Sequence, residues 1–295
     1  MKKKRRLRSW VQLLATFATN GHLIGFLNGK ISQSPLKAGC VPGLNCYSCP
    51  GAVASCPIGS LQAVIGGRKH QFSFYVVGIL LFFGLFLGRA ICGFLCPFGF
   101  LQDLLYKTPL PKLKVPKKAD RPLRFLKYAM LAFAVILLPM LLTNAFGIAP
   151  PYFCKWICPA GTLEGGIPLL IANEGLRKSM GFLFSWKAGL LVLILLSSMT
   201  IYRPFCKYIC PLGAFYALLN RFSLYHLHYE KASCNQCGAC ARVCKMNVDV
   251  TKHPNATECI RCGDCVHVCP RKAITVVMGK ISLAPSELPP KEETI

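Results

Sequence analysis

Four apolar segments dominate the first part of the sequence, and each approaches the roughly 20 residues that a helix needs to cross a lipid bilayer. They cover residues 10–27, 72–91, 125–148 and 182–202. Asn20, Gly21 and His22 interrupt the first segment, and Pro139 near the middle of the third predicts a kink. The pattern predicts an α-helical integral membrane protein with four transmembrane helices.

The pattern changes after the fourth segment, where cysteine-rich polar runs replace the long apolar ones. We therefore expect a four-span membrane domain over 1–227 and an α+β ferredoxin-like domain over 228–282. Short strands are expected in the second domain, for example over 273–278. Residues 283–295 are rich in Pro and Glu and are expected to form a mobile tail.

The distribution of charge predicts how the chain lies in the membrane. The 295-residue chain is 53 % hydrophobic and carries a formal net charge of +24. Six basic residues precede the first apolar segment and eight lie within 107–127, whereas the two opposite loops hold four each. Cytoplasmic loops carry such an excess, so we expect a multi-pass protein of the cytoplasmic (inner) membrane with both termini in the cytoplasm. Basic residues placed beside apolar segments argue against nucleic-acid binding.

Two cysteine runs in the C-terminal domain share the spacing C-x2-C-x2-C-x3-C. This is the ligand spacing of [4Fe–4S] clusters, and in a tandem pair the fourth cysteine of each run ligates the other cluster. Zinc sites and disulfides are alternatives, but neither commonly shows this spacing. The predicted ligands are Cys234, Cys237, Cys240 and Cys269 for one cluster, and Cys259, Cys262, Cys265 and Cys244 for the other.

Four copies of a Cys-Pro-x-Gly motif lie in the membrane domain. Proline is favoured at the first position of a helix, so each Cys-Pro is expected to end one helix and begin the next. The new helix N-terminus would direct its free N–H groups and its dipole at whatever the cysteine binds. Three copies have a second cysteine four residues earlier, one helical turn away. The motif cysteines are Cys56, Cys96, Cys158 and Cys210, and the earlier ones are Cys92, Cys154 and Cys206.

With this topology the four copies alternate between the two sides of the membrane, and the domain divides into related halves at about 1–110 and 120–225. The inner cysteines come from both halves and predict a third [4Fe–4S] cluster beside the ferredoxin domain. On the outer side, four of six cysteines are expected to hold a fourth cluster, which leaves Cys40 and Cys46 for a disulfide or a separate site. The inner set is Cys92, Cys96, Cys206 and Cys210, and the outer set is Cys49, Cys56, Cys154 and Cys158.

The bilayer core is about 30 Å thick. We therefore expect a quinone or a further centre between the inner and outer sets. Arg89 lies one turn before Cys92 and is expected to pair with an anionic cluster or to extend toward the membrane surface. Asp103 and Glu164 follow Cys-Pro motifs and are expected at the membrane interface.

Other uses of the membrane cysteines remain open. Simple packing of thiols is at odds with four copies of one motif. Redox-active dithiols and copper sites are stronger alternatives, because soft thiolates also suit Cu(I). They would make the protein a metal-handling or maturation factor, or a redox sensor. Copper binding that requires Cys154 and Cys158 would favour that alternative.

The C-x3-C-P elements at Cys92 and Cys206, followed by the two cluster motifs, resemble the membrane-bound ferredoxin-type proteins of periplasmic nitrate reductase systems, the NapH kind. The resemblance covers about 75–280 and implies a four-span electron-transfer subunit, often linked to quinol oxidation. The additional element at Cys154 and the cysteine-rich segment 40–56 depart from that family. They favour a centre on the far side of the membrane.

The sequence therefore predicts a membrane iron–sulfur protein that relays electrons between a cytoplasmic partner and a quinone or an outer-face acceptor. It shows no phosphate-binding loop, nicotinamide fingerprint or Ser-His-Asp arrangement. We expect an electron-transfer subunit of an oxidoreductase complex, with two [4Fe–4S] clusters and one or two more at the membrane cysteines. Its expected partners are the membrane, a soluble or membrane redox protein and a quinone.

Overall fold

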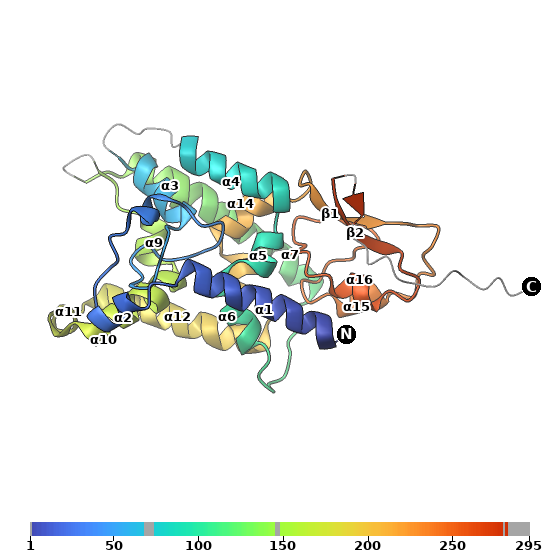
Figure 1. Ribbon diagram of the computed structural model, residues 1–295, viewed down its shortest axis with the longest axis horizontal. Helices are drawn as coiled ribbons and strands as arrows, with labels where there is room; N and C mark the ends of the chain where they lie inside the picture. The colour runs from blue at the N-terminus through green and yellow to red at the C-terminus, as the bar shows by residue number, and fades with distance from the viewer. Residues whose placement is uncertain (1, 68–73, 145–147, 280, 283–295) are drawn as a thin grey trace, which may run out of the picture.

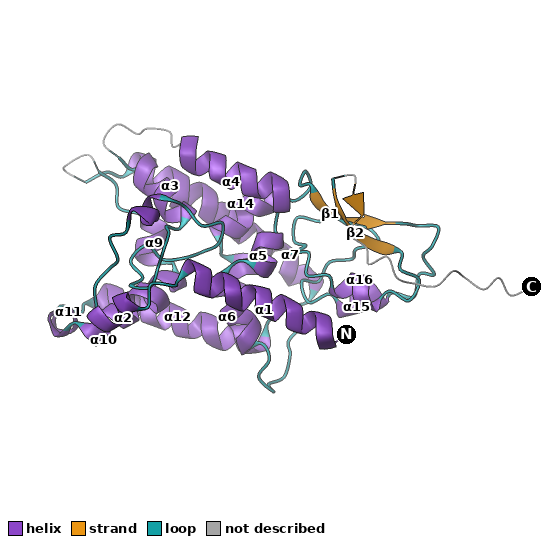
Figure 2. Ribbon diagram, viewed as in Figure 1, coloured by secondary structure: helices purple, strands orange, loops and turns teal. Residues whose placement is uncertain are grey.

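The computed structural model describes residues 2–67, 74–144, 148–279 and 281–282. A helical part makes up most of the molecule, and a small module with a three-stranded sheet lies at one end of it (Figure 1, Figure 2). The predicted tail, 283–295, lies outside the described residues.

The first predicted span is divided in the structure. Helix α1 (Lys2–Thr19) ends where the polar residues begin, and the short helix α2 (Ile24–Asn28) follows. The Asn20 side chain donates to the Thr16 carbonyl (3.4 Å) and to the Thr19 hydroxyl (3.3 Å). Such local side-chain bonds compete with helix continuation. A turn of 3-10 helix, η1 (Pro35–Ala38), and α3 (Pro57–Ile65) complete this region.

The second predicted span becomes α4 (Phe74–Leu87), which ends at Gly88. Gly88 has a φ of +55°, a left-handed conformation that a side chain would strain. The short helices α5 (Ala90–Phe94) and α6 (Pro97–Leu105) then reverse the chain.

The third predicted span begins earlier than expected, at α7 (Lys117–Ala129), and continues through the π-helix η2 (Met130–Leu137) into α8 (Leu138–Leu141). The helix changes from π to α at Leu138, next to Pro139, whose missing N–H cannot donate the α-helical bond to the carbonyl of Val135 in the preceding turn.

The second half of the helical part repeats the order of long and short helices. The long helix α12 (Phe182–Thr200) confirms that the fourth apolar segment is helical. The remaining elements are α9 (Tyr152–Trp156), the π-helix η3 (Gly161–Gly166), α10 (Ile167–Ala172), α11 (Glu174–Lys178), α13 (Pro204–Tyr208) and α14 (Pro211–Leu219).

Two helical stretches among the described residues are long and apolar enough to cross a membrane, Lys118–Leu141 and Phe182–Thr200. Only 28 % and 17 % of their apolar windows are buried inside the protein. The core helix of a soluble protein would be mostly buried, and these two helices are not. Phe74–Leu87 and Gly161–Ala172 are apolar but shorter.

The C-terminal module is built on an antiparallel sheet of β1 (Tyr225–Tyr229), β2 (Ile274–Met278) and β3 (Ile281–Ser282). Tyr225 pairs with Met278 and Tyr229 with Ile274, so β1 begins before the expected boundary at 228. The strand expected over 273–278 is confirmed. Two short helices, α15 (Ala239–Val243) and α16 (Asp264–Val268), lie between β1 and β2 in sequence.

Candidate metal centres

The Cys-Pro-x-Gly motifs adopt the predicted local structure. Cys56, Cys96 and Cys210 are extended residues that precede α3, α6 and α14, and a proline is the first residue of each helix. In all four copies the thiol accepts a hydrogen bond from the N–H of the motif glycine. The first turn of each helix thus directs an N–H group at sulfur, which stabilises a thiolate or a metal-bound sulfur.

The inner set converges in the core. Its four thiols, from Cys92, Cys96, Cys206 and Cys210, have residue exposures of only 4–7 % and lie within electrostatic reach of one another. Gln102 on α6 donates to the Cys206 thiol (3.0 Å) and so crosses from one half of the repeat to the other. The structure therefore brings together the four thiols that the repeat predicts as one site.

Two buried arginines link the inner motifs reciprocally. Arg89 lies three residues before Cys92 and donates to the carbonyl of Cys206 (3.1 Å). Arg203 lies three residues before Cys206 and donates to the carbonyl of Cys92. Both arginines are fully buried. Each half therefore holds the first cysteine of the other half through its own arginine.

The charges of these arginines are only partly balanced by carboxylates. Arg203 makes a two-bond pair with Asp103 (2.6 and 2.7 Å), and Arg8 adds a second cation to that carboxylate (2.6 Å). Burial alone would raise the pKa of Asp103, but Arg203 and Arg8 hold it well below its usual range.

Around Arg89 one carboxylate likewise serves two cations. Glu258 pairs with Arg89 (2.7 Å) and with Lys127 (2.5 Å). The Nε of Arg89 is buried without a hydrogen-bond partner. An anionic group held by the inner thiols would supply the missing negative charge, so the residues present fit a [4Fe–4S] cluster at this position.

The ferredoxin module also gathers its cysteines into the two expected sets. A cavity of about 490 Å³ is lined by Cys234, Cys237, Cys240 and Cys269. A smaller cavity, of about 30 Å³, is lined by Cys244, Cys259, Cys262 and Cys265, together with Cys240. Gly238 and Gly263 directly precede α15 and α16 with φ values of +69° and +79°, left-handed turns that glycine adopts without strain.

The second of these sets lies directly against the inner set. A Cβ on Gly93, next to Cys92, would stand 2.6 Å from the carbonyl oxygen of Ile260, next to Cys259. Asn220 donates to the Cys259 carbonyl (3.1 Å) and accepts from the N–H of Arg89 (3.0 Å). The backbone of the module therefore contacts the backbone of an inner motif without an intervening side chain.

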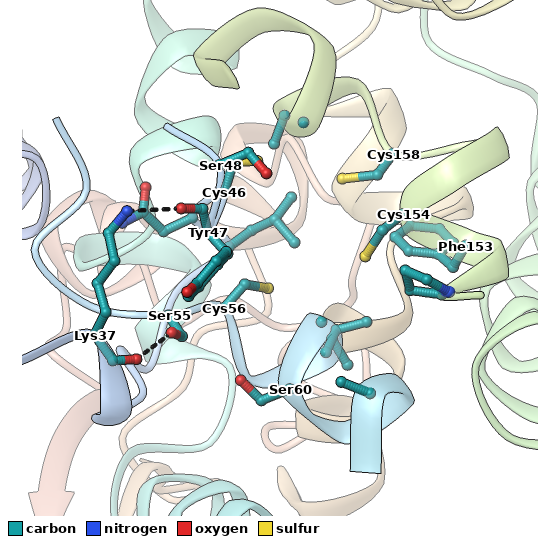
Figure 3. Close-up of a pocket in the computed structure, with 18 of the residues that line it drawn as sticks. Lys37, Cys46, Tyr47, Ser48, Ser55, Cys56, Ser60, Phe153, Cys154 and Cys158 are labelled. Atoms are coloured by element: carbon teal, nitrogen blue, oxygen red, sulfur yellow. Dashed lines mark hydrogen bonds between the residues drawn. The ribbon is translucent and has the colours of Figure 1, made fainter. Parts of the chain in front are cut away.

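The outer thiols face a cavity of about 970 Å³ (Figure 3). It is lined in part by α3 and α9, which lie on the side of the helical part away from the module (Figure 1). Cys56, Cys154 and Cys158 line it as expected, but the structure places Cys46 there, and Cys49 outside the lining. The Cys49 thiol is turned to the Asn20 side chain instead (3.6 Å). Cys40 contacts the Ser60 hydroxyl (3.6 Å), and no disulfide joins it to Cys46.

The inner and outer sets are much closer together than the thickness of a bilayer. The N–H of Leu44 donates to the Cys96 thiol of the inner set. The N–H of the next residue, Asn45, donates to the Cys56 thiol of the outer set. The distance that suggested an additional carrier between the sets is therefore much shorter than expected, because segment 40–56 brings both sets to two consecutive peptide units.

The thiols are not arranged for a single ion. Within the described ranges, no three His, Cys, Asp or Glu side chains lie close enough together to hold one metal ion. A cubane spreads its four iron corners over a larger body, so thiols arranged for a cluster need not meet that condition.

Several of these residues follow patterns that the sequence contains. The pattern R-x2-C-x3-C-P-x-G occurs at Arg89 and at Arg203, and C-P-x-G-x-L-Q ends at Gln62 and at Gln102. Gln62 donates to the outer Cys154 thiol (3.3 Å), as Gln102 does to an inner one. The two carboxylates expected at the membrane interface both have partners within the protein: Asp103 is ion-paired with Arg203, and Glu164 accepts from the Cys46 N–H (2.8 Å).

Comparison with known proteins supports iron–sulfur chemistry. A family model described as a 4Fe-4S binding domain matches residues 70–118, 128–169 and 182–228, so each match contains one C-x3-C-P element. A second model of that description matches 253–275 in the module. The chain therefore contains 4Fe–4S binding domains. No solved structure gives a significant match.

Three relatives show the range of similarity. The uncharacterized protein MJ0750 of Methanocaldococcus jannaschii is 31 % identical over 57 % of this chain and 63 % of its own. The methylamine utilization ferredoxin-type protein MauN of Paracoccus denitrificans is 32 % identical over 57 % and 53 %. The candidate electron transport protein YccM of Escherichia coli is 25 % identical over 62 % and 48 %. The chain thus spans about half to two thirds of the length of these relatives, which include ferredoxin-type and electron transport proteins.

Proposed function

We propose that the protein is a membrane electron-transfer protein that carries single electrons between a soluble partner at the C-terminal module and an acceptor reached through the membrane domain. The observation that carries the proposal is the direct backbone contact between Gly93, beside the inner set, and Ile260, beside the second module set. The named relatives and the 4Fe–4S domain matches support the same chemistry.

The proposed ligands are the two module sets and the inner set. A [4Fe–4S] cluster bound at each would take up and release one electron at a time. The chain's own residues shape these sites. Backbone N–H groups donate to sulfur in the module, from Gln236 to Cys234 and from Val248 to Cys244 (both 3.4 Å). Burial keeps water from the inner thiols, and Arg89 and Arg203 offset their negative charge.

The exposed end of the relay is the first module set, which consists of Cys234, Cys237, Cys240 and Cys269. Cys237 is exposed, whereas the inner thiols are buried. We propose that a redox partner docks at this exposed set, and that the acceptor is a quinone or a protein on the other side of the membrane. The module then belongs on the cytoplasmic side, as the charge distribution predicts.

The membrane arrangement is part of the proposal. Two helices have the length and composition of membrane spans, and we propose that α1 and α4 complete four spans in a multi-pass protein of the cytoplasmic membrane. The outward faces of α4 and α12 carry exposed apolar side chains, such as Phe82, Phe86, Leu193 and Leu196. In water this surface would favour association, whereas lipid accommodates it.

Proteoliposomes with trapped ferricyanide test the proposal without knowledge of the natural acceptor. Dithionite added outside should bleach the trapped ferricyanide faster than in protein-free liposomes. Cys92→Ala with Cys206→Ala should return the rate to that of protein-free liposomes. The proposal fails if the double variant bleaches at the wild-type rate, or if the wild-type protein gives no acceleration.

A further inference from the structure

We propose that the protein holds a fourth metal centre, of the [4Fe–4S] class, on Cys46, Cys56, Cys154 and Cys158. It extends the proposed function and rests on it only for the source of electrons. The family comparison covers only half of this ligand set, because one match, 128–169, contains Cys154 and Cys158, whereas Cys46 and Cys56 lie before the first match at residue 70.

The first argument is the direction of the thiols. Figure 3 shows Cys56 on one side of the cavity and Cys154 and Cys158 on the other, with their sulfur atoms directed into the space between them. Each of these three thiols accepts a hydrogen bond: Cys56 from Asn45 and Gly59, Cys158 from Gly161, and Cys154 from Gln62. Donors directed at sulfur are what a metal-bound thiolate requires.

The second argument is the absence of side chains around these sulfurs. Added Cβ atoms on Gly161 and Gly165 would lie 3.8 and 3.3 Å from the Cys46 sulfur. A Cβ on Gly59 would lie 3.8 Å from the Cys154 sulfur. Glycines from both halves of the repeat thus keep space open around the thiols.

The third argument is charge. Lys37 is buried, and its ammonium donates only to the carbonyl oxygens of Tyr47 (2.8 Å) and Cys49 (3.4 Å). Among the described residues it makes no ion pair with a carboxylate. Lys187 lines the same cavity and donates to the Cys154 carbonyl (3.1 Å). A four-thiolate cluster is anionic, so it would balance these lysines as the inner centre would balance Arg89 and Arg203.

Cys46 is held at the cavity by the opposite half of the repeat. Its N–H donates to Glu164 on η3, six residues after Cys158 (2.8 Å). Tyr216 on α14 donates to the Pro42 carbonyl (2.8 Å) and fixes the start of the same segment. The carboxylate of Glu164 has the same sign of charge as a cluster, so its role is to position Cys46.

This position gives the centre a place in the electron path. Leu44 and Asn45 join it to the inner set through adjoining N–H groups. Its cavity, about 970 Å³, is about twice that at the first module set, about 490 Å³. The fourth centre is therefore the point at which electrons leave the protein on the side away from the module.

The test uses the full chain purified without oxygen, with iron and acid-labile sulfide counted per chain. Cys46→Ala and Cys154→Ala should each lose about four irons, and the double variant should lose no more than either single one. Cys49→Ala and Cys40→Ala are matched controls that should keep the wild-type count. Electron paramagnetic resonance of reduced samples should show unchanged module signals in every variant, which establishes that the fold is intact.

Three outcomes would overturn the fourth centre. Cys46→Ala could retain all of the iron, Cys49→Ala could lose four irons in its place, or the site could hold copper that depends on Cys154 and Cys158. Cys92→Ala separates this inference from the proposed function. If Cys92→Ala loses four irons while the outer variants lose none, only the fourth centre fails, and if Cys92→Ala keeps its iron, the proposed function fails.

Discussion

Replacing Asp103 by alanine should lower the stability of the helical part by more than the removal of an exposed charged side chain does. Asp103 is the carboxylate that Arg203 and Arg8 share, and Arg203 is fully buried. Removing one partner of a buried ion pair costs about 3–5 kcal/mol, because the remaining charge is left without compensation. The Asp103 side chain is 13 % exposed, so we expect the lower end, about 3 kcal/mol.

Thermal unfolding in detergent, at one scan rate, measures this effect. At about 2–4 °C per kcal/mol, the midpoint should fall by roughly 6–12 °C. The matched control is Glu174→Ala, whose pair with Lys178 spans 3.5 Å with side chains 71 % and 78 % exposed. Such pairs contribute about 0–1 kcal/mol. Equal shifts in Asp103→Ala and Glu174→Ala would refute the reasoning.

The pH dependence of the same pair has a defined sign. The pKa of Asp103 is lowered in the folded protein, so its stabilisation is complete above the ordinary carboxyl pKa and is lost only as the pH falls through the lowered value. The difference in midpoint between the wild type and Asp103→Asn should therefore stay constant from pH 8 to pH 5. A difference that shrinks within that window would contradict the ion-pair assignment.

Two further substitutions test the contacts around the inner set. Gly93→Ala places a Cβ 2.6 Å from the Ile260 carbonyl, and such overpacking should lower the stability by about 1–3 kcal/mol in the same unfolding assay. The control is Gly78→Ala, whose Cβ meets nothing within 4 Å and which should be neutral or stabilising. Gln102→Leu removes the donor to the Cys206 thiol and should make the reduction potential of the inner centre more negative; an unchanged potential in a redox titration would show that this bond does not act on the cluster.

Local patterns predicted the local structures. The cysteine spacing of the module and the Cys-Pro-x-Gly repeats depend on residues a few positions apart, so their left-handed glycines and helix starts could be predicted. The four inner cysteines could be grouped because each half carries the same pair. The helix α12 could be predicted because Phe182–Thr200 is long and mostly apolar.

The features that could not be predicted from the sequence depend on contacts between residues far apart in the chain. Cys46, and not Cys49, reaches the outer cavity because Glu164 and Tyr216 hold segment 40–56, and neither contact is encoded by spacing. The closeness of the inner and outer sets depends on the same segment. The division of the first span, by contrast, follows a local signal, because the Asn20 that interrupts the apolar segment bonds to the end of α1.

The proposed relay depends on a cluster at the inner set, and a count of iron and acid-labile sulfide tests that most directly. With protein purified without oxygen, we expect about 16 irons per wild-type chain, four for each of four cubanes. Cys92→Ala with Cys210→Ala should reduce the count to about 12. A wild-type count of about eight, unchanged in the double variant, would restrict clusters to the module and contradict the account.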